Sequence, residues 1–114
     1  MTNVKIFKKN GRTIGFKISG HSGFAESGKD IVCASISSIS QMCLVGLENV
    51  LGLNANVKSC DGFLECKIDK SLNAKLLEKV DLLFNTFEKS IELLLLSDKK
   101  IKKYIDLEVK DEIL

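Results

Sequence analysis

The sequence predicts one two-layer α+β domain over residues 1–114, with a mainly antiparallel sheet, two helices and the element order ββαββαβ. Two turn pairs, Asn10-Gly11 and Asp61-Gly62, each separate two runs with strand character, which is typical of β-hairpins. A long stretch rich in apolar residues follows each hairpin and predicts a helix. Two such helices can cover one side of a single sheet, so two layers result. These patterns do not specify the order of the strands.

The first hairpin joins residues 3–9 and 12–19. A two-residue loop would place the apolar residues of the first strand opposite Lys17 and Gly15. A shift of one residue, with Gly11 in a bulged three-residue loop, instead gathers the apolar side chains on one face. We therefore expect the register that pairs Val4 with Ile18 and Ile6 with Phe16.

The first helix is expected over about residues 30–51, because no charged residue lies between Asp30 and Glu48 and Gly52 can end it. A helix of this composition is expected to be buried on most of its circumference. One face can lie on the sheet, and the remaining apolar surface predicts a homodimer contact. Its several serines argue against a membrane span.

The second hairpin is expected to join residues 54–60 and 63–69 through a two-residue turn. One face then carries the pairs Cys60 with Phe63, Lys58 with Glu65, and Asn56 with Lys67. The other, apolar face carries Ser59 with Leu64, Val57 with Cys66, and Ala55 with Ile68. Cys60 and Cys66 therefore point to opposite faces of the sheet.

A second helix is expected from residue 72 to about 97, with Ser71 as its N-cap. Its apolar stripe is typical of packing on a core. The stripe comprises Leu72, Leu76, Val80, Leu83, Phe87, Ile91 and Leu94, widened by Leu77, Phe84 and Leu95. The opposite side carries Lys75, Lys79, Asp81, Glu88, Lys89 and Glu92. A half-buried strand is expected over residues 102–109, where apolar and acidic residues alternate.

One segment places a histidine and a cysteine within reach of each other. Gly20, Gly23 and Gly28 indicate a loop, and His21, the only histidine of the chain, lies inside it. Asp30 can cap the first helix by accepting the N–H of Cys33, which places Cys33 in the first turn. There the helix dipole favours a thiolate, which a protonated His21 would stabilise further.

This segment resembles a known family. Gly20-His21, then Gly28-x-Asp30-Ile31-Val32-Cys33-Ala34, then Ser37, is similar to the signature of the ribosomal-processing cysteine proteases. These small bacterial enzymes remove an N-terminal extension from a large-subunit ribosomal protein. The resemblance covers the whole chain and implies that His21 and Cys33 are the catalytic pair. Ser22 and Ser35 replace residues that are usually or often alanine there, and both are small enough for the same loop and helix.

The resemblance implies a mechanism in which the Cys33 thiolate forms an acyl-enzyme and His21 protonates the leaving amine. We expect the N–H groups of Cys33 and Ala34 to be free and to form an oxyanion hole. Asp30 can either cap the helix or hold the His21 ring, and the cap is favoured by its position. Segment 20–29 is expected to be mobile until a peptide binds, with Phe24 packing on that peptide or on the domain.

Composition excludes several other functions. The net charge of +2, from 17 basic and 15 acidic residues, does not predict RNA binding, even with a basic turn at Lys8, Lys9 and Arg12. Four cysteines without a CxxC pair and one histidine predict neither a metal site nor another cofactor. Free thiols and the lack of a signal-peptide pattern predict a cytoplasmic protein. The alternative function is a non-catalytic, ribosome-associated binding module with a buried Cys33, and a metallohydrolase is a distant third.

Overall fold

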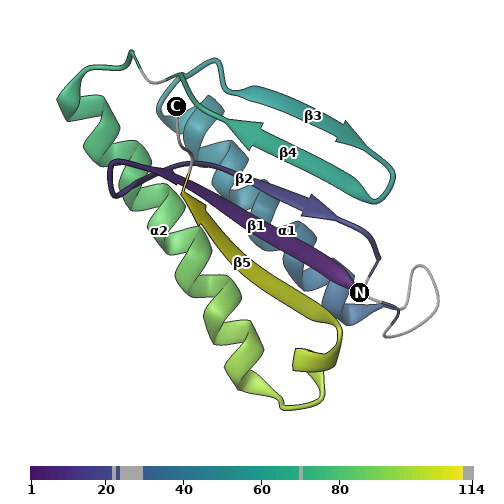
Figure 1. Ribbon diagram of the computed structural model, residues 1–114. Helices are drawn as coiled ribbons and strands as arrows, with labels where there is room; N and C mark the ends of the chain where they lie inside the picture. The colour runs from purple at the N-terminus through teal and green to yellow at the C-terminus, as the bar shows by residue number, and fades with distance from the viewer. Residues whose placement is uncertain (22, 24–29, 70, 112–114) are drawn as a thin grey trace.

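A computed structural model describes residues 1–21, 23, 30–69 and 71–111 of the chain. The elements follow the predicted order ββαββαβ (Figure 1). They are β1 (Thr2–Lys9), β2 (Arg12–Ser19), α1 (Ile31–Val45), the π-helical turn η1 (Gly46–Val50), β3 (Asn56–Cys60), β4 (Phe63–Lys67), α2 (Ala74–Ser97), the 3-10 turn η2 (Ile101–Lys103) and β5 (Ile105–Asp111).

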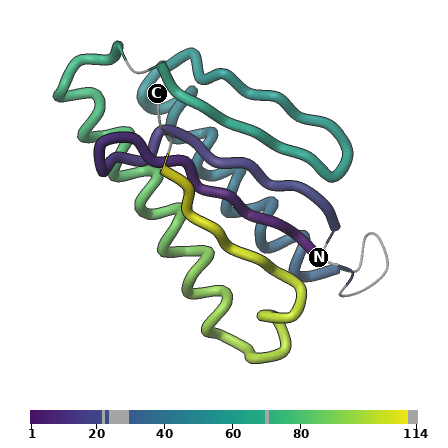
Figure 2. The backbone as a smooth tube through the Cα atoms, in the orientation of Figure 1, coloured from purple at the N-terminus to yellow at the C-terminus, as the bar shows by residue number. Residues whose placement is uncertain are grey.

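The five strands form one sheet in the order β3-β4-β2-β1-β5, and both helices cover the same face of it (Figure 1). All neighbours are antiparallel except β1 and β5, which run parallel although they lie at opposite ends of the sequence (Figure 2). The predicted α+β fold with a mainly antiparallel sheet is confirmed. Antiparallel hairpins need only a short turn, whereas parallel strands need a long crossover connection. Helix α2, between β4 and β5, provides the crossover that brings β5 into the sheet parallel to β1.

The first hairpin has the predicted register, but a bulge within β2 and not a three-residue loop produces it. Val4 pairs with Ile18 and Ile6 with Phe16, as expected. The loop, however, has two residues, and the predicted three-residue loop is wrong: Lys9 pairs with Arg12, and Asn10 and Gly11 both have positive φ, as a type I′ turn requires. The register shift comes from a bulge within β2, where Ile14 is the extra residue.

The second hairpin pairs as predicted. Cys60 lies opposite Phe63, and the remaining pairs of β3 and β4 follow in the expected register through Asn56 and Lys67. Cys66 is fully buried and Cys60 is exposed, so the two thiols face opposite sides of the sheet. Because β4 also pairs with β2, Cys66 lies beside Phe16 in the core.

Helix α1 is buried on one side only, and the prediction that most of its circumference is buried was wrong. The buried residues recur at helical spacing and face the sheet: Val32, Ile36, Ser40, Cys43, Leu44 and Leu47. Ile31, Met42 and Val45 are exposed, so no described segment of the chain covers this side of the helix. By length and a mean hydropathy of 1.5, Ile31–Val50 could span a membrane, a property it shares with core helices of globular domains. Its sheet-facing side belongs to the core here.

Helix α2 begins two residues later than predicted, and Asn73, not Ser71, is its N-cap. The Asn73 side chain accepts the N–H of Leu76 at 2.9 Å, whereas the Ser71 N–H donates to the Asp69 carboxylate in the preceding turn. The stripe packs on the core as expected, and the Phe87 ring stacks on Phe16 with 4.3 Å between centroids.

Two further expectations are corrected. Glu88 does not belong to the solvated side of α2; it is 9 % exposed and pairs with Lys8 of the first hairpin at 3.4 Å. Its burial is tolerated because a cation accompanies it. The last strand begins at Ile105 and not at residue 102, since η2 turns the chain first.

Candidate active site

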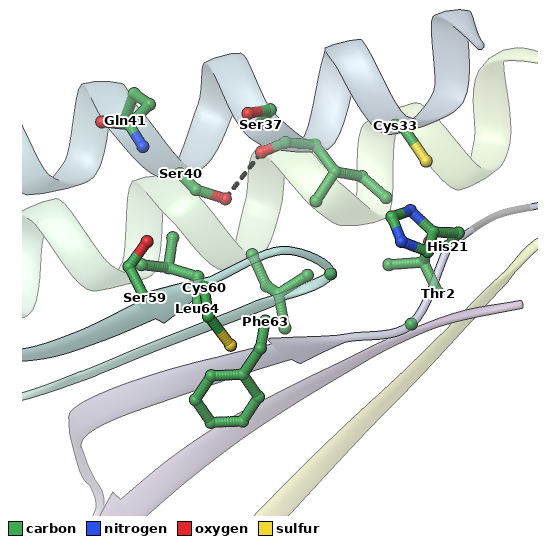
Figure 3. Close-up of a pocket in the computed structure, with 14 residues that line it drawn as sticks. Thr2, His21, Cys33, Ser37, Ser40, Gln41, Ser59, Cys60, Phe63 and Leu64 are labelled. Atoms are coloured by element: carbon green, nitrogen blue, oxygen red, sulfur yellow. Dashed lines mark hydrogen bonds between the residues drawn. The ribbon is translucent and has the colours of Figure 1, made fainter. Parts of the chain in front are cut away.

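His21 and Cys33 line the same cavity, which has a volume of about 220 Å³ (Figure 3). It lies between the start of α1, the end of β2 and the β3–β4 hairpin. These elements and β1 contribute the polar residues Thr2, Ser37, Ser40, Gln41, Ser59 and Cys60. Apolar side chains at Ile18, Ile36, Phe63 and Leu64 complete the lining, with Gly20 and Gly62. The sequence pattern therefore identified two residues that the fold does bring together.

Helix geometry aligns the α1 side of the cavity. Cys33, Ser37 and Gln41 recur every four residues, so they form a row along one face of the helix. Figure 3 shows the Cys33 sulfur directed toward the His21 ring at one end of this row. Ser37, the last residue of the signature, lines the cavity one turn after Cys33.

The four thiols differ sharply in environment. Burial raises the pKa of the Cys43 thiol from 9.0 to about 12. Burial, with smaller contributions from Cys43 and Glu48, raises the pKa of Cys66 to about 12 as well. Cys33 is partly exposed and Cys60 exposed. Desolvation therefore disfavours the charged form of the Cys43 and Cys66 thiols.

Asp30 caps α1, the favoured one of the two predicted roles. Its Oδ1 accepts the N–H groups of Val32 and Cys33, each at 3.0 Å, and the residue is 8 % exposed. This geometry fixes the first turn and hence the direction of the Cys33 side chain. Among the described residues, Asp61 and not Asp30 places its carboxylate near the His21 ring.

The expectation that the N–H groups of Cys33 and Ala34 are free is wrong. The Cys33 N–H donates to the Asp30 side chain, and the Ala34 N–H donates to the Asp30 carbonyl at 3.0 Å. The capping arrangement explains both bonds, because the N-cap carboxylate satisfies the second and third N–H groups and its carbonyl starts the helical ladder. Ala34 therefore contributes the first helical bond and not a free donor.

The end of β2 positions His21 against the tip of the β3–β4 hairpin. Gly20 has φ +86°, and its N–H donates to the Gly62 carbonyl at 2.9 Å. The His21 ring follows directly and lies over Gly62, with Nε2 3.9 Å from the Asp61 carboxylate. Asp61 and Gly62 appeared in the sequence only as a turn. Their contact with His21 depends on β2 pairing with β4, which no local pattern specifies.

The rest of the predicted loop is described in part. Gly23 has φ +73°, and a β-carbon at this position would meet no atom within 4 Å, so the backbone conformation itself favours a glycine there. Phe24 and Gly28 lie outside the described residues, as does most of the predicted mobile segment. Within the described part of the chain, no three His, Cys, Asp or Glu side chains cluster in a way that could hold a metal ion.

Comparisons with known proteins agree with this geometry. A sequence profile of the family described as cysteine protease Prp matches residues 1–106. A search of curated protein sequences gives no match. Among solved structures, the Streptococcus mutans protein SMU.848 is similar with a TM-score of 0.76 at 24% identity, over 98% of this chain and 96% of its own.

Two structures of the essential ribosomal processing protease Prp from S. aureus are also similar. The complex with a covalently linked product peptide has a TM-score of 0.77 at 22% identity. The complex with a substrate peptide has a TM-score of 0.78 at 18% identity. Each likeness covers 96% of this chain and 100% of the other. At these identities the structures establish the shared fold.

Proposed function

This chain belongs to the cysteine protease Prp family and is a cysteine protease, and we propose that Cys33 and His21 form its catalytic pair. The observation that carries the proposal is their position: both line one cavity, and the Cys33 sulfur is directed toward the His21 ring (Figure 3). The burial of Cys43 and Cys66 supports the assignment, because it leaves few thiols able to ionise.

The reaction has two balanced halves. The Cys33 thiolate attacks the scissile carbonyl carbon, a C–S bond forms, and the peptide C–N bond breaks while the His21 imidazolium gives its proton to the leaving amine. Neutral His21 then takes a proton from water, and the resulting hydroxide attacks the thioester. Cleavage of the C–S bond releases the product as a carboxylic acid, which loses its proton to solvent. The thiolate is restored, and His21 is again an imidazolium because it holds the proton taken from water.

We propose that the substrate is the N-terminal extension of a large-subunit ribosomal protein. Support comes from the family of the chain and from the S. aureus protease of similar fold, whose structures hold a substrate peptide and a covalently linked product peptide. The cavity suits a peptide with an apolar side chain near the scissile bond, since Ile18, Ile36 and Leu64 line it beside Cys33. The free thiols support a cytoplasmic location.

Cleavage of the extended ribosomal protein tests this function directly. The purified enzyme should release one N-terminal peptide, and mass spectrometry should map a single cut next to an apolar residue. Cys33→Ala and His21→Ala should each leave the ribosomal protein intact while retaining the circular dichroism spectrum of the wild type. Binding of the extended protein without any cut by the wild-type enzyme would contradict the proposal.

A further inference from the structure

We propose that the tip of the β3–β4 hairpin, formed by Asp61 and Gly62, positions the His21 imidazole for catalysis. The inference rests on the proposed role of His21 and adds two positioning residues to it. The tip is a separate segment of the chain, about 40 residues after His21. It reaches the site because β4 pairs with β2 up to Ser19 opposite Phe63.

The His21 ring packs directly against the backbone of Gly62. A β-carbon built on Gly62 would lie 2.9 Å from His21 Nε2 and 3.5 Å from both Cδ2 and Cε1. The imidazole therefore covers the Gly62 backbone at a distance that no side chain at this position permits. The hydrogen bond from the Gly20 N–H to the Gly62 carbonyl holds the two backbones together at 2.9 Å. Any side chain at position 62 would have to push the ring aside.

Asp61 supplies the charge that orients the ring. Its Oδ2 lies 3.9 Å from Nε2, on the same ring edge that contacts Gly62. The Asp30 carboxylate accepts the helix N–H groups of Val32 and Cys33 through Oδ1. With Nε2 directed at the hairpin, we assign proton exchange with the Cys33 sulfur to Nδ1. A carboxylate on the far side of the ring favours this orientation.

The pair is exposed, which limits its strength and makes it sensitive to salt. The side chains of His21 and Asp61 retain 66% and 99% of their accessible surface. Exposed ion pairs contribute little and are screened by added salt. The contact with Gly62 is steric and independent of salt. The two residues therefore make separable contributions that two pairs of variants can distinguish.

Gly62→Ala and Gly11→Ala form a matched pair for the steric contribution. Gly62 and Gly11 are both turn glycines, with φ of +70° and +77°, so alanine strains the backbone similarly at both positions. Nothing lies within 4 Å of a β-carbon on Gly11. Both variants should lose similar unfolding free energy. Only Gly62→Ala should lose activity, by about tenfold to a hundredfold in kcat, as expected for a displaced catalytic group.

Asp61→Asn and Glu65→Gln form the matched pair for charge, since Glu65 lies on the same hairpin, opposite Lys58 and Lys17. At low ionic strength, Asp61→Asn should reduce kcat about two- to fivefold with KM unchanged. Added salt should abolish the difference from the wild type, and Asp61→Glu should restore activity. The imidazole proton signals of His21, the only histidine, should shift in Asp61→Asn and not in Glu65→Gln.

The outcomes separate this inference from the proposed function. Activity in His21→Ala would overturn the catalytic pair itself. If His21→Ala is inactive while Gly62→Ala matches Gly11→Ala in kcat, contact with Gly62 does not position the His21 ring for catalysis. If Asp61→Asn matches the wild type at low salt and its imidazole signals are unchanged, Asp61 does not orient it.

Discussion

Cys33 differs from Cys43 and Cys66 in being only partly buried, and from Cys60 in lying in the first turn of a helix. It sits in the first turn of α1, held there by the Asp30 cap, and is partly exposed. Cys43 and Cys66 are more buried and carry pKa values raised to about 12 by that burial. Cys60 is exposed at the end of β3 and lines the same cavity. Cys60 is therefore the control for every experiment on Cys33.

Cys33→Ala should abolish cleavage without unfolding the protein, because a methyl group replaces a partly exposed thiol and removes only the nucleophile. Cys60→Ala should keep at least half of the wild-type kcat/KM. Steady-state cleavage and thermal unfolding of both variants provide the measurement. Substantial turnover by Cys33→Ala would contradict the role of Cys33 as nucleophile.

The buried thiols predict a loss of stability at alkaline pH. Cys66 has a pKa of about 12 in the folded protein against 9.0 for an unperturbed thiol. The unfolded chain therefore releases this proton first as the pH rises. The stabilisation is complete below pH 9 and is lost between about 9 and 12, with a slope of up to about 1.4 kcal/mol per pH unit.

Cys66→Ala should therefore flatten the decline of unfolding free energy between about pH 9 and 10.5, measured by urea titration at several pH values. Cys60→Ala, which changes an exposed thiol, should retain the wild-type slope. The comparison uses slopes, so the packing lost on truncating Cys66 does not affect it. Equal slopes in all three proteins would show that Cys66 ionises alike in both states.

The sequence identified the site residues that lie close to one another along the chain. His21, Cys33 and Asp30 lie within one segment, and capping rules apply over three residues. Asp61 and Gly62 could not be found in the same way, since their contact with His21 crosses about 40 residues of sequence. The expectation of free N–H groups at Cys33 and Ala34 failed because the cap and the first helical hydrogen bond use these groups.

At the level of single elements, the two hairpins show what a turn pair can predict. Asp61-Gly62 defined the β3–β4 register completely, because that hairpin is regular. In the first hairpin, the three-residue loop chosen to match the apolar residues is wrong: Asn10-Gly11 forms a two-residue loop, and the bulge at Ile14 changes the register beyond it. Hydrophobic matching recovered the right pairs, since a slip of one residue would move Val4 and Ile6 from the buried face. It did not locate the bulge.

The N-cap of α1 is the element-level feature with the clearest test. Asp30→Ala removes the acceptor of two N–H groups and should lower the unfolding free energy by about 0.5–2 kcal/mol. Asp30→Asn retains a capping oxygen and should remain within about 0.5 kcal/mol of the wild type. Urea unfolding of both variants, with cleavage assays alongside, makes the comparison.

These two variants also distinguish capping from a direct role in orienting His21. If Asp30 acts as a cap, Asp30→Asn should keep most of the cleavage activity, because the first turn of α1 stays ordered. If Asp30→Asn is stable but inactive, the negative charge of Asp30 is needed for catalysis, and capping alone does not explain its role.

At the scale of the whole molecule, the strand order was beyond the reach of the sequence patterns. Pairing of β1 with β5 joins the two ends of the chain, and pairing of β2 with β4 bypasses α1. Such contacts depend on the global packing of apolar faces and not on adjacent residues. The same limitation explains the error about α1: its uncharged composition did not reveal that α2 lies beside it and leaves its outer side uncovered.

That outer side is a shallow apolar groove between the two helices. It has a volume of about 630 Å³ and is lined by Ile31, Ala34, Ser35, Ser38, Ile39, Ser90, Leu93 and Leu94. Ile31 is 60% exposed and Leu93 68% exposed. Exposed apolar patches of this kind commonly mark contacts between protein chains. The predicted homodimer would pair this surface with its own copy about a two-fold axis.

Light scattering at tens of micromolar should therefore give about twice the chain mass of 12.6 kDa. Leu93→Lys should yield the monomer, because two lysines brought together at a two-fold interface would lose hydration without gaining partners. Val109→Lys, on β5 and 48% exposed, changes an apolar residue far along the sheet edge and should leave the dimer intact. Dissociation in Val109→Lys alone would place the interface on the sheet edge, and a monomeric wild type would exclude the dimer at these concentrations.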